Sequence, residues 1–178
     1  MQNLETERLL LRTLRLEDSE RVEVLASDYD VAKSTLTIPH PYPEGSARDF
    51  ITSILEAEKS GRISIFAIEE KESGQLIGII NVSIAESYKR GELAYWIGKP
   101  YWGKGYGTEA TKALISYSFN QLKLNKVFAC AFTDNPGSWK IMEKVGLKYE
   151  GTLKQHVSRD GVFYDLCYYG LLKDEYSQ

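Results

Sequence analysis

The segment from Tyr95 to Ala110 constrains the fold and the function of this chain more than any other. It reads as an apolar strand, then a turn with glycines at 103, 105 and 107, then a helix. Alternating glycines let the backbone approach a bulky ligand and direct several N–H donors toward one point. The helix N-terminus behind them adds partial positive charge, so the segment predicts a site for a phosphate or pyrophosphate group.

The glycine spacing does not fit the two commonest nucleotide-binding turns. The dinucleotide fingerprint is G-x-G-x-x-G within a βαβ unit, whereas this chain has G-x-G-x-G and no such helix–strand alternation before it. A P-loop needs a serine or threonine after its lysine, and Lys104 is followed by Gly105. The alternative is a turn that joins strand to helix and binds no ligand, but such turns are usually short and need one glycine rather than three.

Composition restricts the class of protein. The 178 residues, 43% of them hydrophobic, fit one globular domain, which we expect to span residues 1–178. The net charge of −3 argues against a nucleic-acid binder. We expect no membrane partner, because no apolar run approaches a transmembrane span. The N-terminal residues lack the pattern of a signal peptide, so we expect a cytoplasmic location.

The metal-ligating and thiol residues are few. Cys130 and Cys167 each lie in an apolar or aromatic run, there is no C-x-x-C, and the only histidines are His40 and His156. This pattern predicts no metal site and no Cys–His nucleophile. We interpret both cysteines as buried core thiols.

Hydrophobic periodicity predicts a mixed α/β fold in the order β-α-α-β-β-β-α-β-α-β-β, with a seven-stranded sheet and helices on both faces. The near-continuous apolar run at 127–132 indicates a central strand covered on both sides. Asn135-Pro136 opens the last helix and Gly146 ends it. The expected strands are 6–14, 62–69, 76–84, 92–97, 127–132, 147–157 and 162–171, and the expected helices are 17–27, 46–60, 106–121 and 136–146.

Three stretches carry a resemblance that covers nearly the whole chain. They are E-T-E-R-L-L-L-R at 5–12, A-Y-W-I at 94–97 running into Y-W-G-K-G-Y-G at 101–107, and N-P-G-S at 135–138 with E-K-V-G-L at 143–147. In this order, they resemble the RimJ/RimL-like group of the GNAT superfamily, the acyl-CoA-dependent N-acyltransferases. The resemblance implies a mostly antiparallel sheet. In one departure, Trp102 stands where the superfamily has Gln or Arg.

The resemblance implies acetyl-CoA as co-substrate and no metal. N–H groups of residues 103 to 108 would hold its pyrophosphate, and Lys104 would add a point charge near a phosphate. The strand 92–97 would splay from its neighbour, and pantetheine would pair with the backbone there like an added strand. The implied cofactor-binding residues are Trp96, Ile97, Gly103, Lys104, Gly105, Tyr106, Gly107, Thr108, Asn135 and Ser138.

The resemblance also implies two catalytic residues. Many GNAT enzymes place a tyrosine acid on the helix after Asn135, but Met142 stands at that position here, so Ser138 is the candidate hydrogen-bond donor to the leaving thiolate. Glu92 is the candidate base, acting directly or through water on the attacking amine. A solvent-facing glutamate near a strand start is the alternative interpretation of Glu92.

The expected reaction is direct attack of a primary amine on the acetyl thioester. The resemblance favours a protein N-terminal α-amine of the ribosomal-protein type. A small-molecule acetyltransferase of the polyamine or aminoglycoside type, and a non-catalytic acetyl-CoA-binding module, remain as alternatives. The acceptor would lie between the loop at 36–45, with Tyr42, and the last hairpin, with Phe163 and Tyr164. The chain would be a monomer or a homodimer.

Overall fold

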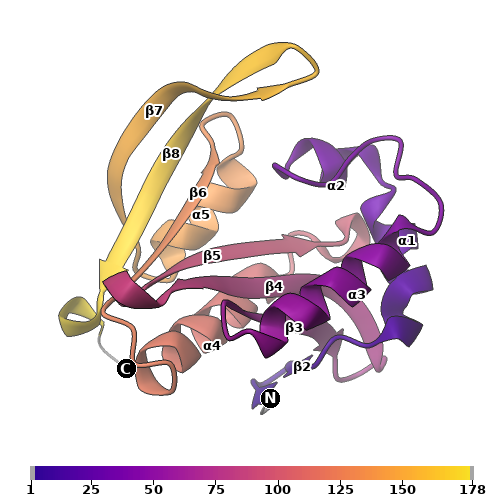
Figure 1. Ribbon diagram of the computed structural model, residues 1–178, viewed down its shortest axis with the longest axis horizontal. Helices are drawn as coiled ribbons and strands as arrows, with labels where there is room; N and C mark the ends of the chain where they lie inside the picture. The colour runs from indigo at the N-terminus through magenta and orange to yellow at the C-terminus, as the bar shows by residue number, and fades with distance from the viewer. Residues whose placement is uncertain (1–2, 177–178) are drawn as a thin grey trace.

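The computed structural model describes residues 3–176, in which an eight-stranded sheet carries helices on both faces (Figure 1). The strand order is β1-β2-β3-β4-β5-β6-β8-β7, and every neighbouring pair is antiparallel except β5 and β6. The strands are β1 (Leu4–Glu5), β2 (Leu9–Arg12), β3 (Ile63–Glu70), β4 (Gln75–Ala85), β5 (Arg90–Ile97), β6 (Lys126–Phe132), β7 (Lys148–Arg159) and β8 (Val162–Leu172). The α-helices are α1 (Ser19–Ala26), α2 (Tyr29–Lys33), α3 (Ser46–Lys59), α4 (Tyr106–Asn120) and α5 (Pro136–Lys144).

The predicted mixed, mostly antiparallel class is confirmed, but the count of seven strands and the two-helix start are wrong. The eighth strand is β1, which contains only two residues and pairs with β2. The extra helix is α2, whose five residues follow an Asp28 side chain that accepts a hydrogen bond from the Asp30 N–H. Both elements are too short to show a hydrophobic period, so the sequence pattern could not reveal them.

Two apolar cores lie on opposite faces of the sheet because successive strand residues point to opposite sides. Phe66 of β3 belongs to the core under α4, and its neighbour Ile65 belongs to the core under α1 and α3. In β4, Ile80 belongs to the core under α4, and Ile79 belongs to the core under α1 and α3. The central strands are therefore buried on both faces, which gives the rigid platform on which β5 and the glycine turn are held.

Strands β5 and β6 separate after a short parallel contact. They pair only from Arg90–Glu92 to Lys126–Phe128, although β5 continues to Ile97 and β6 to Phe132. The remaining five residues of β5 therefore have a sheet neighbour only on the β4 side. This opening in the sheet places free backbone groups of β5 next to the N-termini of α4 and α5.

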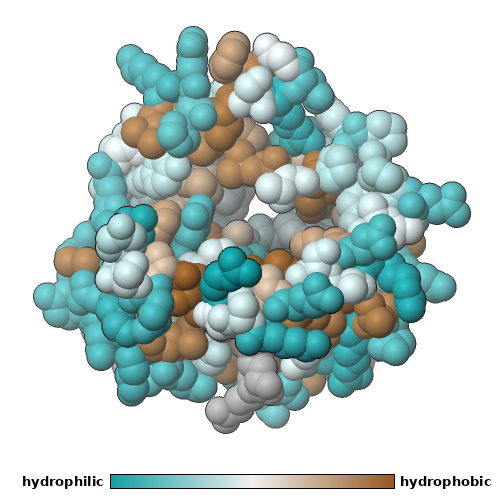
Figure 2. All heavy atoms as spheres, viewed as in Figure 1, coloured by the Kyte–Doolittle hydropathy of each residue, from teal (hydrophilic) through white to brown (hydrophobic). Residues whose placement is uncertain are grey.

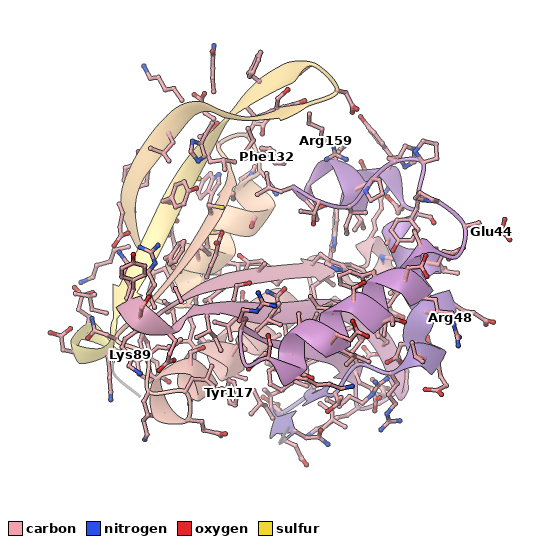
Figure 3. All side chains as sticks on the ribbon, in the orientation of Figure 1. Glu44, Arg48, Lys89, Tyr117, Phe132 and Arg159 are labelled. Carbon is pink, nitrogen blue, oxygen red and sulfur yellow. The ribbon has the colours of Figure 1, made fainter. Side chains whose placement is uncertain are left out.

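The β7–β8 hairpin extends from the sheet toward α2, as Figure 1 shows at the top of the molecule. Arg159, at the end of β7, closes this approach (Figure 3). Its guanidinium donates hydrogen bonds to the carbonyl oxygens of Ala32, Thr35 and Ile38 at 2.7, 2.9 and 3.0 Å. The hairpin tip thereby fixes the loop after α2, whose carbonyl groups the charged donor satisfies.

A buried ion pair fixes the start of α1 to the sheet. The Arg12 side chain donates to both carboxylate oxygens of Asp18 and to Glu69, and Arg12 is only 7% exposed. Burial alone raises the pKa of Asp18, but the hydrogen bonds from Arg12 and the Arg15 N–H lower it overall. Arg12 and Asp18 therefore form a buried charged pair, in which each group compensates the charge of the other.

Replacing Arg12 with methionine is expected to lower the free energy of unfolding by about 3–5 kcal/mol, because it leaves two carboxylates without their partner. Urea denaturation at pH 7 measures the loss. Lys148→Met is the matched control, since the pair between Lys148 and Glu175 is exposed and its loss is expected to change little. Equal stability of the two variants would contradict a structural role for the Arg12 pair.

Candidate active site

The glycine turn forms a cradle of unpaired N–H donors. Gly103 and Gly105 have φ angles of +74° and +82°, a region that glycine enters without strain. Within residues 3–176, no acceptor takes the six N–H groups from Gly103 to Thr108, and the first bonded N–H of α4 is that of Glu109, to the Gly105 carbonyl. Six free donors at a helix N-terminus fit an anionic group such as a pyrophosphate.

The N-terminal segment holds this turn in place. The Glu109 carboxylate, on the first turn of α4, accepts hydrogen bonds from the Thr6 hydroxyl and from the backbone N–H and side chain of Arg8. Arg8 also donates to the Lys104 carbonyl at 2.9 Å. Burial alone raises the pKa of Glu109, but these hydrogen bonds lower it overall, so the carboxylate stays ionised. The E-T-E-R stretch therefore supports the cradle from behind.

A groove of about 440 Å³ runs from the cradle to the N-terminus of α5. Trp102, the residue that replaces the expected Gln or Arg, lines it and donates its indole N–H to the Ile97 carbonyl at 2.6 Å. The groove is lined by Ser34, Tyr95, Trp96, Ile97, Tyr101, Trp102, Gly103, Gly105, Tyr106, Gly107, Thr108, Asn135, Pro136, Gly137, Ser138, Lys140, Ile141 and Lys144.

The lysines that line the groove are Lys140 and Lys144, whereas the role predicted for Lys104 stays a prediction. The Lys104 ammonium lies 5.5 Å from the centre of the Tyr101 ring, and Lys104 does not line the groove. Only its backbone N–H belongs to the cradle. Lys140 and Lys144 line the groove instead, one turn apart on α5. They look like ordinary surface lysines in the sequence, because only the packing of α5 against α4 brings them to the groove.

A second cavity of about 660 Å³ lies on the other side of β5, between the sheet, α1, α3 and the loop that Arg159 fixes. Figure 2 shows the molecule hollowed in this region. Tyr42 lines this cavity, whereas Phe163 and Tyr164 do not. The four residues that line both the cavity and the groove are Ser34, Tyr95, Trp96 and Ser138. We call the second space the acceptor cavity.

Ser138 and Tyr95 form a hydroxyl pair where the two spaces meet. The Tyr95 hydroxyl donates to the Ser138 carbonyl at 2.9 Å, and the Ser138 hydroxyl lies 3.4 Å from the Tyr95 oxygen, to which it can donate. Burial raises the pKa of Tyr95 to about 12, so its hydroxyl stays protonated in the neutral range. Tyr95 thus places a protonated hydroxyl beside Ser138, a contact that the sequence pattern does not predict.

Glu92 lies in the wall of the acceptor cavity rather than in solvent. The Cys130 thiol, across from it on β6, is 3.7 Å from a Glu92 carboxylate oxygen and donates to it. Burial, with the nearby Glu92 charge, raises the pKa of Cys130 to about 11, so the thiol keeps its proton and serves as a donor. Tyr95 lies three positions after Glu92 on β5, a rise of about 10 Å along the strand. To act at the Ser138 end, Glu92 would therefore work through water.

The family model described as the acetyltransferase (GNAT) domain matches residues 8–148. This chain belongs to the GNAT acetyltransferase family. It is 33% identical over 178 residues to the N-acetyltransferase p20 of Bacillus licheniformis, with 99% of each chain covered. The protein is therefore an N-acetyltransferase.

Two further relatives place this GNAT enzyme within its family. The chain is 28% identical over 173 residues to the ribosomal protein uS5 alanine N-acetyltransferase of Escherichia coli, with 91% of this chain and 86% of that protein covered. It also matches the crystal structure of a GNAT acetyltransferase from Bacillus anthracis with a TM-score of 0.88 and 28% identity, over 98% and 100% of the two chains. Within residues 3–176, no helix has the length and apolar character needed to cross a membrane.

The backbone of β5 refines the predicted pantetheine contacts of the GNAT site. The Gly98 N–H donates a hydrogen bond to the Ile77 carbonyl of β4. Two residues before Gly98, Trp96 of β5 lies opposite Ile79 of β4. Because bonded pairs alternate in an antiparallel ladder, the backbone groups of Trp96 face β4 and are occupied. Tyr95 and Ile97 face the opening instead. Trp96 therefore lines the groove with its side chain, while Ile97 keeps a free N–H.

Asn135 begins α5 but does not cap it with its side chain. Its amide N–H donates to the Ser34 carbonyl at 3.0 Å, and its backbone carbonyl accepts from the Ser138 N–H. The side-chain bond ties the α5 N-terminus to the loop that Arg159 fixes. In this GNAT site, Asn135 thus positions the helix start that presents Ser138.

Proposed function

We propose that this GNAT enzyme transfers an acetyl group from acetyl-CoA to the α-amine of a polypeptide N-terminus by direct attack of the amine. One observation carries the proposal: a groove with a phosphate cradle and a separate cavity meet at the Ser138 and Tyr95 hydroxyls. Two substrates that enter from opposite sides of β5 would bring their reactive groups together at that point.

The groove fits acetyl-CoA by the chemistry of its donors. The N–H groups of residues 103–108 would hold the pyrophosphate, and Lys140 and Lys144 would add positive charge beside it. The free backbone groups of Tyr95 and the Ile97 N–H would pair with the amide-containing arm, as an added strand does. When bound, acetyl-CoA supplies the acetyl group as a thioester, which an amine can attack without a metal.

Two groups of the chain would handle protons. Glu92 accepts a hydrogen bond from the Cys130 thiol, which holds its carboxylate in place. The carboxylate would take a proton from the incoming amine through a water molecule. The Ser138 hydroxyl would turn from Tyr95 and donate a hydrogen bond to the leaving thiolate. An α-amine has a pKa of about 7.7–8.0, against about 10.4 for lysine, so deprotonating it at neutral pH costs less free energy.

Two observations support a polypeptide acceptor. The relative from Escherichia coli acts on the alanine of ribosomal protein uS5, as its name states. In addition, large apolar side chains stand exposed near the cavity: Leu36 is 43% exposed, Val162 52% and Phe163 62%. The Arg159 contacts bring the hairpin tip that carries Val162 and Phe163 to the loop that carries Leu36. An exposed apolar rim suits a protein surface better than a small polar amine.

The proposal is tested by mass spectrometry of two peptides incubated with the enzyme and acetyl-CoA. One peptide has a free N-terminus and no lysine, and the other has a blocked N-terminus and one lysine. We expect acetylation of the first at its α-amine and little of the second. Acetylation of the lysine peptide alone, or of small polyamines but neither peptide, would contradict the proposal.

Ser138→Ala is expected to lower kcat about tenfold, while the Kd for acetyl-CoA changes less than threefold, because one hydrogen bond to a charged leaving group is lost. Steady-state kinetics and calorimetric titration measure the two quantities. Ser116→Ala, on the side of α4, is the control for loss of a hydroxyl. An equal loss in kcat and in acetyl-CoA affinity would assign Ser138 to binding alone.

A further inference from the structure

The acceptor cavity carries a single formal charge. Among its lining residues, all within the described part of the chain, Glu92 is the only acidic or basic one. Most of the others are apolar, among them Leu36, Ile38, Phe50, Ile79 and Phe132. The remaining polar groups are hydroxyls, the Cys130 thiol and the Asn81 amide. One carboxylate in an apolar wall is complementary to one ammonium group and to no more.

This charge count discriminates between acceptor classes. A charge taken from water into an apolar cavity is costly unless it is paired. A polyamine or an aminoglycoside would bring several ammonium groups to one carboxylate. A free amino acid or a phosphate-bearing amine would bring an anion to a cavity with no cationic side chain. A peptide N-terminus with an uncharged apolar first residue brings one charge only, its α-amine.

Asn81 is the one amide among the described lining residues, so it is the position at which a nearly isosteric change adds a carboxylate. In the β4–β5 register, Ser83 lies opposite Glu92, and Asn81 lies opposite Ala94. Asn81 and Glu92 are therefore diagonal neighbours on one face of the sheet, about 7–8 Å apart, and both line the cavity. An aspartate at position 81 has nearly the same shape as asparagine and adds the second carboxylate that a dication would require.

We propose that the acceptor cavity selects a polypeptide N-terminus whose first residue is uncharged and apolar, and that Asn81 sets this selectivity by keeping the cavity at one negative charge. The inference rests on the proposed function, because it specifies the acceptor of that same site. Glu92 then both attracts the α-ammonium group and receives its proton. The exposed rim at Leu36 and Phe163 accommodates the residues that follow the first one.

The test compares peptides that differ only in a first residue of leucine, lysine or aspartate, with spermidine and tyramine as small amines. Activity is read as kcat/KM by release of coenzyme A. Binding is read without acetyl-CoA, by fluorescence anisotropy of the same peptides labelled at their C-termini. The variants are Asn81→Asp and Gln75→Glu. The second is the matched control, an amide-to-acid change on the same strand but exposed and outside the cavity.

For the wild type we expect the leucine peptide to have the highest kcat/KM and the highest affinity. The lysine peptide is expected to be lower by about tenfold or more in both quantities, and the aspartate peptide lower still. Asn81→Asp is expected to raise the ratio of kcat/KM for the lysine peptide to that for the leucine peptide about tenfold. Gln75→Glu is expected to leave this ratio unchanged. Equal use of the lysine peptide or spermidine by the wild type would overturn the inference, as would identical shifts in the two variants. Turnover of tyramine, but of no peptide and not of spermidine, would support the charge rule while rejecting the polypeptide acceptor.

Discussion

Replacing Gly105 with valine is expected to weaken acetyl-CoA binding at least about 100-fold, a larger effect than any other single change at the groove. Gly105 has a φ of +82°, and a Cβ there would lie 3.4 Å from the Arg8 guanidinium. Valine would leave the left-handed region and turn neighbouring N–H donors away from the cradle. Losing two hydrogen bonds to a charged group at about 1.5–3 kcal/mol each accounts for the factor. Calorimetric titration measures it.

Gly74→Val separates this effect from general strain. Gly74 has a φ of +64° in the turn between β3 and β4, with open space where its Cβ would stand. The two variants therefore carry a similar backbone penalty, and their thermal stabilities are expected to fall by similar amounts. Only Gly105→Val is expected to lose acetyl-CoA. Unchanged affinity in Gly105→Val would show that the cradle does not hold the pyrophosphate.

Replacing Glu92 with glutamine is expected to lower kcat about 100-fold at pH 7 while the Kd for acetyl-CoA stays unchanged. The amide keeps the shape of the side chain and can still accept from Cys130, but it cannot take a proton. Glu92 lines the acceptor cavity and not the groove, so acetyl-CoA binding is spared. The KM for the acceptor is expected to rise, because the only charge in the cavity is lost.

The pH dependence of Glu92→Gln identifies its role. An α-amine with a pKa of about 7.7–8.0 is mostly protonated at pH 7 and mostly neutral at pH 9. The defect relative to wild type is therefore expected to shrink as the pH rises from 7 to 9, because a base is needed less. Glu56→Gln, on the exposed side of α3, is the control. A defect of the same size at both pH values would mean that Glu92 positions the acceptor without taking its proton.

Much of the fold is readable from the sequence because its main elements are long and strongly patterned. The central apolar strands, the glycine turn and α4 follow from periodicity and from turn residues. The misses are short elements: β1 has two residues and α2 has five, and neither can show a period. The helix expected at 46–60 is present as α3, and its N-cap is Gly45 with a φ of +78°.

In the candidate site too, some features could be predicted from the sequence and others could not. The backbone cradle is predictable, since glycine at 103 and 105 reports a required backbone conformation. The side chains around it are not, because their placement depends on how distant elements pack. Lys140 and Lys144, rather than Lys104, reach the groove through the position of α5. Tyr95 meets Ser138, and Arg159 meets Thr35, across more than forty and more than one hundred residues respectively.

A thermal-shift titration tests most directly whether the glycine turn holds acetyl-CoA. A ligand present at 100 times its Kd stabilises the folded state by about 2.7 kcal/mol, which raises the Tm of a protein of this size by several degrees. Acetyl-CoA, NAD and ATP are titrated side by side. We predict a saturable rise with acetyl-CoA and none with the other two. A rise with NAD or ATP and none with acetyl-CoA would contradict the account.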